Sequence, residues 1–228
     1  MTDLAIVVEG ATEEAFVNRV LAPALWVHET YAWAVLPGKG ETRRGGRWPW
    51  DSVRGDVARL MKERDDRYCS ILFDYYGLPK EWPGRQAASK KPIEDRGRVV
   101  EEALLADLVE HLGDDFKAER FVPHIQLHEY EARLFSDCVA LGEVLGIAPA
   151  DLQMIVKECG SPEAIDDGDK TAPSKRLDNL CREKTRRGYG KTTDGVTAAE
   201  CVTIPTMRAA CPHFAKWLER IESIGAAA

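Results

Sequence analysis

The first apolar run of the chain, Ile6 to Val8, ends on Glu9 and Gly10 and passes at once into an amphipathic segment. Thr12 with two glutamates behind it is typical of a capped helix start. The stretch therefore predicts a strand, a tight turn and a helix, with Glu9 at the carboxyl end of the strand. In open α/β sheets, ligands and catalytic groups collect at that edge. An ordinary turn with an exposed glutamate has the same local pattern, so the later strands decide between the two interpretations.

Apolar runs and helical periodicities alternate over the first 131 residues. The expected helices are long enough to cross over between parallel strands, so the pattern predicts a parallel sheet of about four strands flanked by helices. A non-periodic segment rich in Gly and Pro, residues 75–92, predicts a long loop after the third strand. The expected strands are residues 6–8, 31–36, 68–73 and 121–127, and the expected helices are residues 12–25, 51–64 and 94–112.

The pattern becomes helical with breaks near residue 132. We therefore expect an α/β fold with two regions: an α/β core over residues 1–131 and a helical C-terminal region over residues 132–228 that packs on it. The expected C-terminal helices are residues 134–145, 149–159, 174–186, 197–200 and 204–224, and a further turn or helix is expected to begin at residues 161–163.

Composition excludes some classes of protein. No run approaches the roughly 18 apolar residues that a membrane span needs, and the N-terminus lacks the features of a signal peptide, so we expect a cytoplasmic protein without a membrane partner. A net charge of −7 over 228 residues argues against a surface that is basic throughout, although positive charge does cluster locally. The six cysteines form no C-x-x-C pair, which favours reduced thiols.

Carboxylates recur where the predicted strands end. Asp74 follows the third strand, and Glu129 and Glu131 follow the fourth, at places equivalent to that of Glu9. If the first and third strands are neighbours, these acids converge, and their mutual repulsion favours a bound cation. Oxygen ligands suit Mg²⁺, and Mn²⁺ is the close alternative. We therefore predict that Glu9, Asp74, Glu129 and Glu131 form a catalytic metal site, against the simpler interpretation that they are exposed acids at loop starts.

Several other side chains have two interpretations each. Five basic residues could bind substrate phosphates or could be solvated surface groups: Arg43, Arg44, Lys175, Arg176 and Lys191. Trp48, Trp50 and Trp82 flank the long loops and could stack on bases or anchor the loops to the core. His128 could be a ligand or proton carrier, or a hydrogen-bonded structural residue.

The ordered motifs resemble a known family along essentially the whole chain. They are Val-Glu-Gly-Ala-Thr-Glu-Glu from Val8, Phe-Asp-Tyr-Tyr-Gly from Phe73, His-Glu-Tyr-Glu-Ala from His128, Ser-Pro-Glu from Ser161, Thr-Ala-Pro-Ser-Lys-Arg from Thr171, and Cys-Pro-His-Phe from Cys211. Together they resemble the DUF4276 family of Toprim-like bacterial proteins, and the first two resemble the Toprim fold of topoisomerases, primases and OLD-type nucleases.

The resemblance implies roles for individual residues. Glu9 corresponds to the Toprim glutamate, a metal ligand or general acid/base, and Asp74 to the first acid of the Toprim Asp-x-Asp pair. Tyr76 stands where the second acid is expected. Glu129 or Glu131 could supply the missing charge, or the site could be degenerate.

Two functions follow as expectations. The first is a metal-dependent nuclease acting on DNA or RNA, which the resemblance places in anti-phage defence or a toxin-type system, often with an ATPase partner. The alternative is a non-catalytic regulatory or nucleic-acid-binding subunit that keeps the Toprim scaffold and works with an ATPase.

Overall fold

The computed structural model describes residues 1–38, 47–113, 116–165, 168 and 170–226. The chain divides into two compact units, residues 1–127 with 217–228, and residues 128–216. The boundary that we predicted after residue 131 lies close to this division. The prediction differs in placing residues 217–228 with the helical region, whereas they belong to the first unit.

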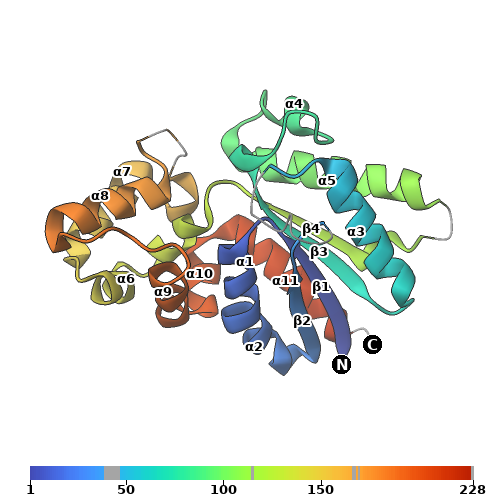
Figure 1. Ribbon diagram of the computed structural model, residues 1–228, viewed down its shortest axis with the longest axis horizontal. Helices are drawn as coiled ribbons and strands as arrows, with labels where there is room; N and C mark the ends of the chain where they lie inside the picture. Colours follow the sequence, from blue (N-terminus) through green and yellow to red (C-terminus); the bar gives the residue numbers. More distant parts are fainter. Residues whose placement is uncertain (39–46, 114–115, 166–167, 169, 227–228) are drawn as a thin grey trace. The chain divides into compact units, whose positions relative to one another are not determined.

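The first unit is built on four parallel strands in the order β2-β1-β3-β4 (Figure 1). The predicted parallel sheet is therefore confirmed, and the first and third strands are neighbours. The register pairs Val8 with Leu72 and Asp74 with Gln126, so β1, β3 and β4 end at one edge. The strands are β1 (Thr2–Val8), β2 (Thr30–Val35), β3 (Tyr68–Asp74) and β4 (Phe121–Gln126).

Helices connect successive strands, as the sequence predicts. After β1 the chain forms α1 (Ala11–Phe16), the π-helical turn η1 (Val17–Leu21), α2 (Ala22–Leu25) and η2 (Trp26–His28). The later connections contain α3 (Trp50–Glu63), η4 (Tyr75–Gly77), α4 (Arg85–Ala88), α5 (Ile93–Leu112) and η5 (Ala118–Arg120). The segment predicted as a loop over residues 75–92 thus contains two short helical turns, η4 and α4.

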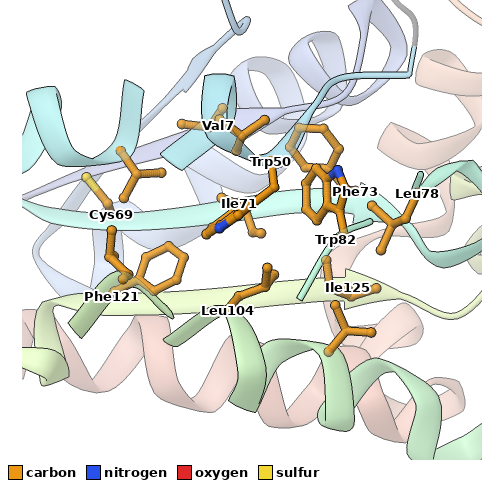
Figure 2. Packing of buried hydrophobic residues seen from close by; sticks show 14 of the residues in the cluster. Val7, Trp50, Cys69, Ile71, Phe73, Leu78, Trp82, Leu104, Phe121 and Ile125 are labelled. Carbon is orange, nitrogen blue, oxygen red and sulfur yellow. The ribbon is translucent and has the colours of Figure 1, made fainter. Parts of the chain in front are cut away.

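One face of the sheet packs against α3 and α5. Figure 2 shows Val7, Ile71 and Phe121 from the strands meeting Trp50 of α3 and Leu104 of α5. All five are at most 5% exposed, and burying a large apolar side chain contributes roughly 1.5–3 kcal/mol. This cluster therefore fixes the strands that carry Glu9 and Asp74 at their ends.

The opposite face of the sheet receives the end of α11 (Pro212–Ala226). Successive strand residues point to opposite faces, so Ser70 and His124 face away from Ile71 and Ile125. Trp217 of α11 donates its indole N–H to Ser70 Oγ over 3.0 Å and stacks on His124 with ring centroids 4.8 Å apart. The last residues of the chain are thereby part of the first unit.

The first helix begins without the predicted cap. Its N-cap residue is Gly10, and no side-chain hydrogen bond caps the helix. Glu14 N–H instead donates to the Gly10 carbonyl over 3.0 Å. The capping prediction from Thr12 is therefore wrong: the helix already begins at Ala11, so Thr12 lies inside its first turn.

The second unit is helical over most of its length. Its elements are η6 (Tyr130–Ser136), α6 (Cys138–Leu145), α7 (Pro149–Cys159), η7 (Pro162–Ala164), α8 (Pro173–Thr185), α9 (Asp194–Val202), α10 (Ile204–Ala210) and the start of α11. The predicted helical C-terminal half is confirmed.

Two helices predicted as continuous are divided in the structure. Asp137 interrupts the one predicted over residues 134–145, and its side chain accepts hydrogen bonds from the N–H groups of Val139 and Ala140 as the cap of α6. Cys211 interrupts the one predicted over residues 204–224, with φ −125° and ψ 86°. Pro212 follows directly, and a helical backbone conformation is disfavoured for the residue before a proline.

Two other expectations concern the whole chain. All six cysteines are free, in agreement with the expectation of reduced thiols. Within the described part of the chain, no helix has the length and apolar character needed to cross a membrane.

Candidate acidic site at the carboxyl edge of the sheet

The backbone of Glu9 is held on both sides. Its N–H donates to the Leu72 carbonyl over 3.2 Å, and its own carbonyl accepts the indole N–H of Trp48 over 3.1 Å. The Trp48 carbonyl in turn accepts the indole N–H of Trp82 over 2.8 Å. Trp82 is buried in the core cluster. Glu9 is therefore fixed where β1 ends rather than placed on a free turn.

Glu9 and Asp74 lie together because β1 and β3 are adjacent. Glu9 Oε2 accepts the backbone N–H of Asp74 over 3.1 Å. Both side chains are partly exposed. The Glu9 carboxylate therefore contacts the neighbouring strand. The simpler interpretation was an exposed acid at the start of a loop, which would make no such contact.

Gln126 also lies at this edge, although we did not predict it from the sequence. It is the register partner of Asp74, and its Nε2 donates to Asp74 Oδ1 over 3.1 Å. It is 6% exposed. The signal in the sequence was weak, because an uncharged amide inside the last apolar run becomes informative only when the strand register is known.

The turn after Asp74 is made by η4. Tyr75 is buried. The guanidinium carbon of Arg85 lies 3.9 Å from the centroid of the Tyr75 ring, and Arg85 donates a hydrogen bond to the Tyr75 hydroxyl over 2.7 Å. Burial raises the pKa of Tyr75, and the charges of Arg85 and Arg96 only partly oppose this. Tyr76 is 37% exposed, and its hydroxyl accepts a hydrogen bond from Arg96 over 3.0 Å. The position expected for a second acid therefore holds a phenol bonded to an arginine.

Glu129 and Glu131 lie in the second unit. Glu129 accepts the backbone N–H and the hydroxyl of Ser174, each over 2.8 Å, at the start of α8. Lys191 Nζ lies 3.1 Å from Glu129 Oε1 and 3.6 Å from Glu131 Oε2. Glu131 is 1% exposed and also accepts the hydroxyl of Tyr189 over 3.5 Å.

These contacts set the ionisation of Glu129. Burial of the carboxyl group would raise its pKa, but the hydrogen bonds from Ser174 and the charge of Lys191 outweigh burial, so the pKa is lowered. A carboxylate at the start of a helix is also stabilised by the helix dipole. Glu129 thus has a structural role at α8, and convergence of Glu129 and Glu131 on Glu9 and Asp74 stays a prediction.

The predicted phosphate-binding residues differ in their surroundings. Lys175 is exposed on α8, while Lys191 is paired with the two glutamates. Arg176 donates to the Thr171 carbonyl over 2.8 Å and lies 3.9 Å from Glu158. Arg43 and Arg44 lie outside the described residues.

The tryptophans and His128 also have identifiable surroundings. Trp48 and Trp82 donate to backbone carbonyls, and Trp50 donates to Asp107 over 2.6 Å. These bonds favour the loop-anchoring interpretation over base stacking. His128 is 1% exposed, which favours a structural role.

The pair of Glu9 and Asp74 has the donor chemistry of a magnesium site. Both offer hard carboxylate oxygens, and Mg²⁺ in proteins is commonly held by one or two carboxylates, retained waters and substrate phosphates. One carboxylate oxygen of Asp74 accepts a hydrogen bond from Gln126, which orients the carboxylate. Residues that hydrogen-bond to metal ligands in known metal sites orient those ligands in the same way. Glu9 and Asp74 thus offer the kind of donor group that Mg²⁺ or Mn²⁺ takes, and a bound cation at this edge stays a prediction.

Comparison with solved structures found similarity to the C-terminal region of the OLD protein of Xanthomonas campestris pv. campestris. The two are 17% identical, with a TM-score of 0.43 over 98% of this chain and 96% of that one. A comparison with curated proteins found no match. The family model of DUF4276, a domain of unknown function, matches residues 8–222, which include Glu9, Asp74, Gln126, Glu129 and Glu131. The chain therefore belongs to the DUF4276 family.

Proposed function

We propose that the protein is a metal-dependent nuclease that hydrolyses phosphodiester bonds in DNA or RNA, with Glu9 and Asp74 as ligands of Mg²⁺ or Mn²⁺. The observation that carries the proposal is the 3.1 Å hydrogen bond from Asp74 N–H to Glu9 Oε2 between adjacent parallel strands. From β1 the chain continues to β2 on one side, and from β3 it continues to β4 on the other. The strand order thus reverses between β1 and β3, and open α/β sheets bind ligands at such a topological switch point.

The proposal gives each residue a physical role. A divalent cation at Glu9 and Asp74 supplies a Lewis acid for the phosphoryl oxygen and lowers the pKa of bound water. Gln126 orients Asp74, and Trp48 holds the backbone of Glu9. The exposed Lys175 is a candidate contact for the nucleic-acid backbone.

The remaining parts of the proposal come from the family resemblance. We propose that the protein acts in the cytoplasm, in anti-phage defence or a toxin-type system, and that an ATPase partner controls it. Arg43, Arg44, Arg176 and Lys191 stay candidates for substrate binding, and Glu129 and Glu131 stay candidates for further metal ligands. Lys191 is paired with Glu129 and Glu131. This pairing must open before Lys191 can bind a substrate phosphate or the two glutamates can bind a metal ion.

The test is cleavage of single- and double-stranded DNA and RNA by the purified protein in Mg²⁺ or Mn²⁺, alone and with a co-encoded ATPase. Glu9→Gln and Asp74→Asn keep the side-chain shapes and remove the charges, so each should lower the rate by roughly 10²-fold or more. Glu94→Gln, an exposed acid in the first turn of α5, is the matched control and should cleave like the parent. Intact substrates under every condition, or a fully active Glu9→Gln, would refute the proposal.

A second candidate function is a non-catalytic subunit that retains the scaffold. It is favoured by Tyr76, whose hydroxyl is bonded to Arg96 where a second acid is expected. Titration with Mn²⁺ separates the candidates. A nuclease should bind the ion in a manner that Asp74→Asn abolishes, whereas a scaffold subunit should show no binding that depends on Asp74.

A further inference from the structure

Gly77 lies against the carboxylate of Glu9. A Cβ atom at this position would lie 2.8 Å from Glu9 Oε1, closer than Cβ atoms approach other heavy atoms in proteins, and 3.2 Å from Oε2, which is also a tight contact. Gly77 is outside the left-handed region that favours glycine, so its backbone conformation does not demand this residue. We propose that Gly77 is a positioning residue of the acidic site, and that its missing side chain is the space that the Glu9 carboxylate occupies.

The turn that carries Gly77 cannot easily move away. Tyr75 and Leu78, on either side of it, are 1% and 5% exposed and belong to the core cluster. Leu78 N–H donates to the Tyr75 carbonyl over 3.3 Å, which closes the turn, and Arg85 holds the Tyr75 hydroxyl. A side chain added at Gly77 would therefore meet Glu9 with the turn in place.

The backbone of Glu9 is fixed as well, by Leu72 on one side and Trp48 on the other. Its side chain has rotatable bonds and ends in the two oxygens that the new Cβ would meet. Relief of the contact is consequently a rotation of Glu9 away from Gly77, which removes its hydrogen bond from Asp74 N–H. The fold survives this change, but the two carboxylates lose their arrangement. The value of Gly77 for metal binding rests on the proposed function, whereas its effect on Glu9 does not.

The first measurement follows the Asp74 amide in ¹H–¹⁵N spectra of Gly77→Ala. The resonance should shift and lose protection from hydrogen exchange, as it should in Glu9→Ala. Gly55→Ala is the matched control, because Gly55 also lies in the first unit outside the left-handed region and has no atom within 4 Å of an added Cβ. In the Glu9→Ala background, adding Gly77→Ala should leave the Asp74 amide where Glu9→Ala alone places it, which excludes a direct effect of the new methyl group.

The second measurement is Mn²⁺ binding by calorimetry. Gly77→Ala should raise the dissociation constant by roughly 10- to 100-fold, the size seen when an outer-shell partner of a ligand is lost, and Gly55→Ala should not change it. An unchanged Asp74 amide in Gly77→Ala overturns the inference. If the parent itself binds no Mn²⁺, the proposed metal site fails, while the amide still decides whether Gly77 positions Glu9.

Discussion

The side-chain amide of Gln126 donates to Asp74 Oδ1 over 3.1 Å, between residues that are register partners on β4 and β3. The amide offers Asp74 a hydrogen-bond donor without placing a second negative charge beside it. Because Gln126 is the last residue of β4, this strand ends on an amide, whereas β3 ends on a carboxylate. Glu9 and Asp74 are therefore the carboxylates that the ends of β1, β3 and β4 bring to this edge.

Gln126→Glu should test this arrangement. The variant replaces the donor with a like charge beside Asp74, so it should lower the free energy of unfolding at pH 7 by about 1–3 kcal/mol. Repulsion raises the folded-state pKa of one acid above its unfolded value, so the loss should appear as pH rises above about 4 and fade below it. Urea unfolding across pH measures this. Gln126→Leu, which removes the donor without adding charge, should show a much weaker pH dependence, and equal profiles would contradict the account.

Trp48→Phe should loosen Glu9 while keeping most of the ring in place. The variant removes the indole N–H that the Glu9 carbonyl accepts, together with part of the ring system, so we expect a loss of at least about 1 kcal/mol in the free energy of unfolding. Mn²⁺ binding should weaken with it. Trp26→Phe is the control, because Trp26 is 56% exposed. If both variants behave like the parent in urea unfolding and calorimetry, the Trp48 bond does not stabilise the site.

The sheet and the pairing of Glu9 with Asp74 could be predicted because local signals agree along the chain. Apolar runs separated by helical periodicities specify parallel strands, and a carboxylate directly after a strand must lie at the carboxyl edge. Gln126 and Gly77 could not be found in this way. One depends on strand register and the other on the approach of a turn to a side chain, and neither leaves a periodic pattern in the sequence.

The positions of two helix breaks and the packing of the last helix were also not predicted. Pro212 and Asp137 were visible in the sequence and mark the two helix breaks that the periodicity alone did not show. The return of Trp217 to the sheet depends on contacts with Ser70 and His124, far away in the sequence. Helical periodicity predicts that α11 has an apolar side, but not which surface that side covers.

The buried cysteines should report the opening of each unit. Burial raises the pKa of Cys69 in the first unit to about 12 and that of Cys211 in the second unit to about 12. Since the thiolate is the reactive form, both should resist Ellman's reagent at pH 8 until their units open, whereas the exposed Cys201 should react at once. Mass spectrometry of labelled peptides in rising urea measures the order. Labelling of Cys69 as fast as Cys201 in native buffer would contradict the buried placement.

Lys191→Met should expose the electrostatic balance of Glu129 and Glu131. The ammonium group is a cause of the lowered pKa of Glu129, so its loss should reduce the free energy of unfolding at pH 7. Lys191 is 48% exposed, so we expect about 1 kcal/mol after solvent screening. An acid with a lowered folded-state pKa contributes stability above its ordinary pKa of about 4.3, and this contribution is lost as pH falls through the folded-state value.

The difference between Lys191→Met and the parent should therefore be largest at neutral pH and shrink below about pH 4. Lys175→Met is the matched control, because Lys175 is exposed in the same unit and should change stability little at any pH. Urea unfolding at pH 3 and pH 7 measures the difference, and a loss of equal size at both would show that Lys191 acts through packing alone. If Glu129 and Glu131 also bind the divalent cation, loss of Lys191 removes the ammonium group that competes with it, and Mn²⁺ should then stabilise Lys191→Met more than the parent.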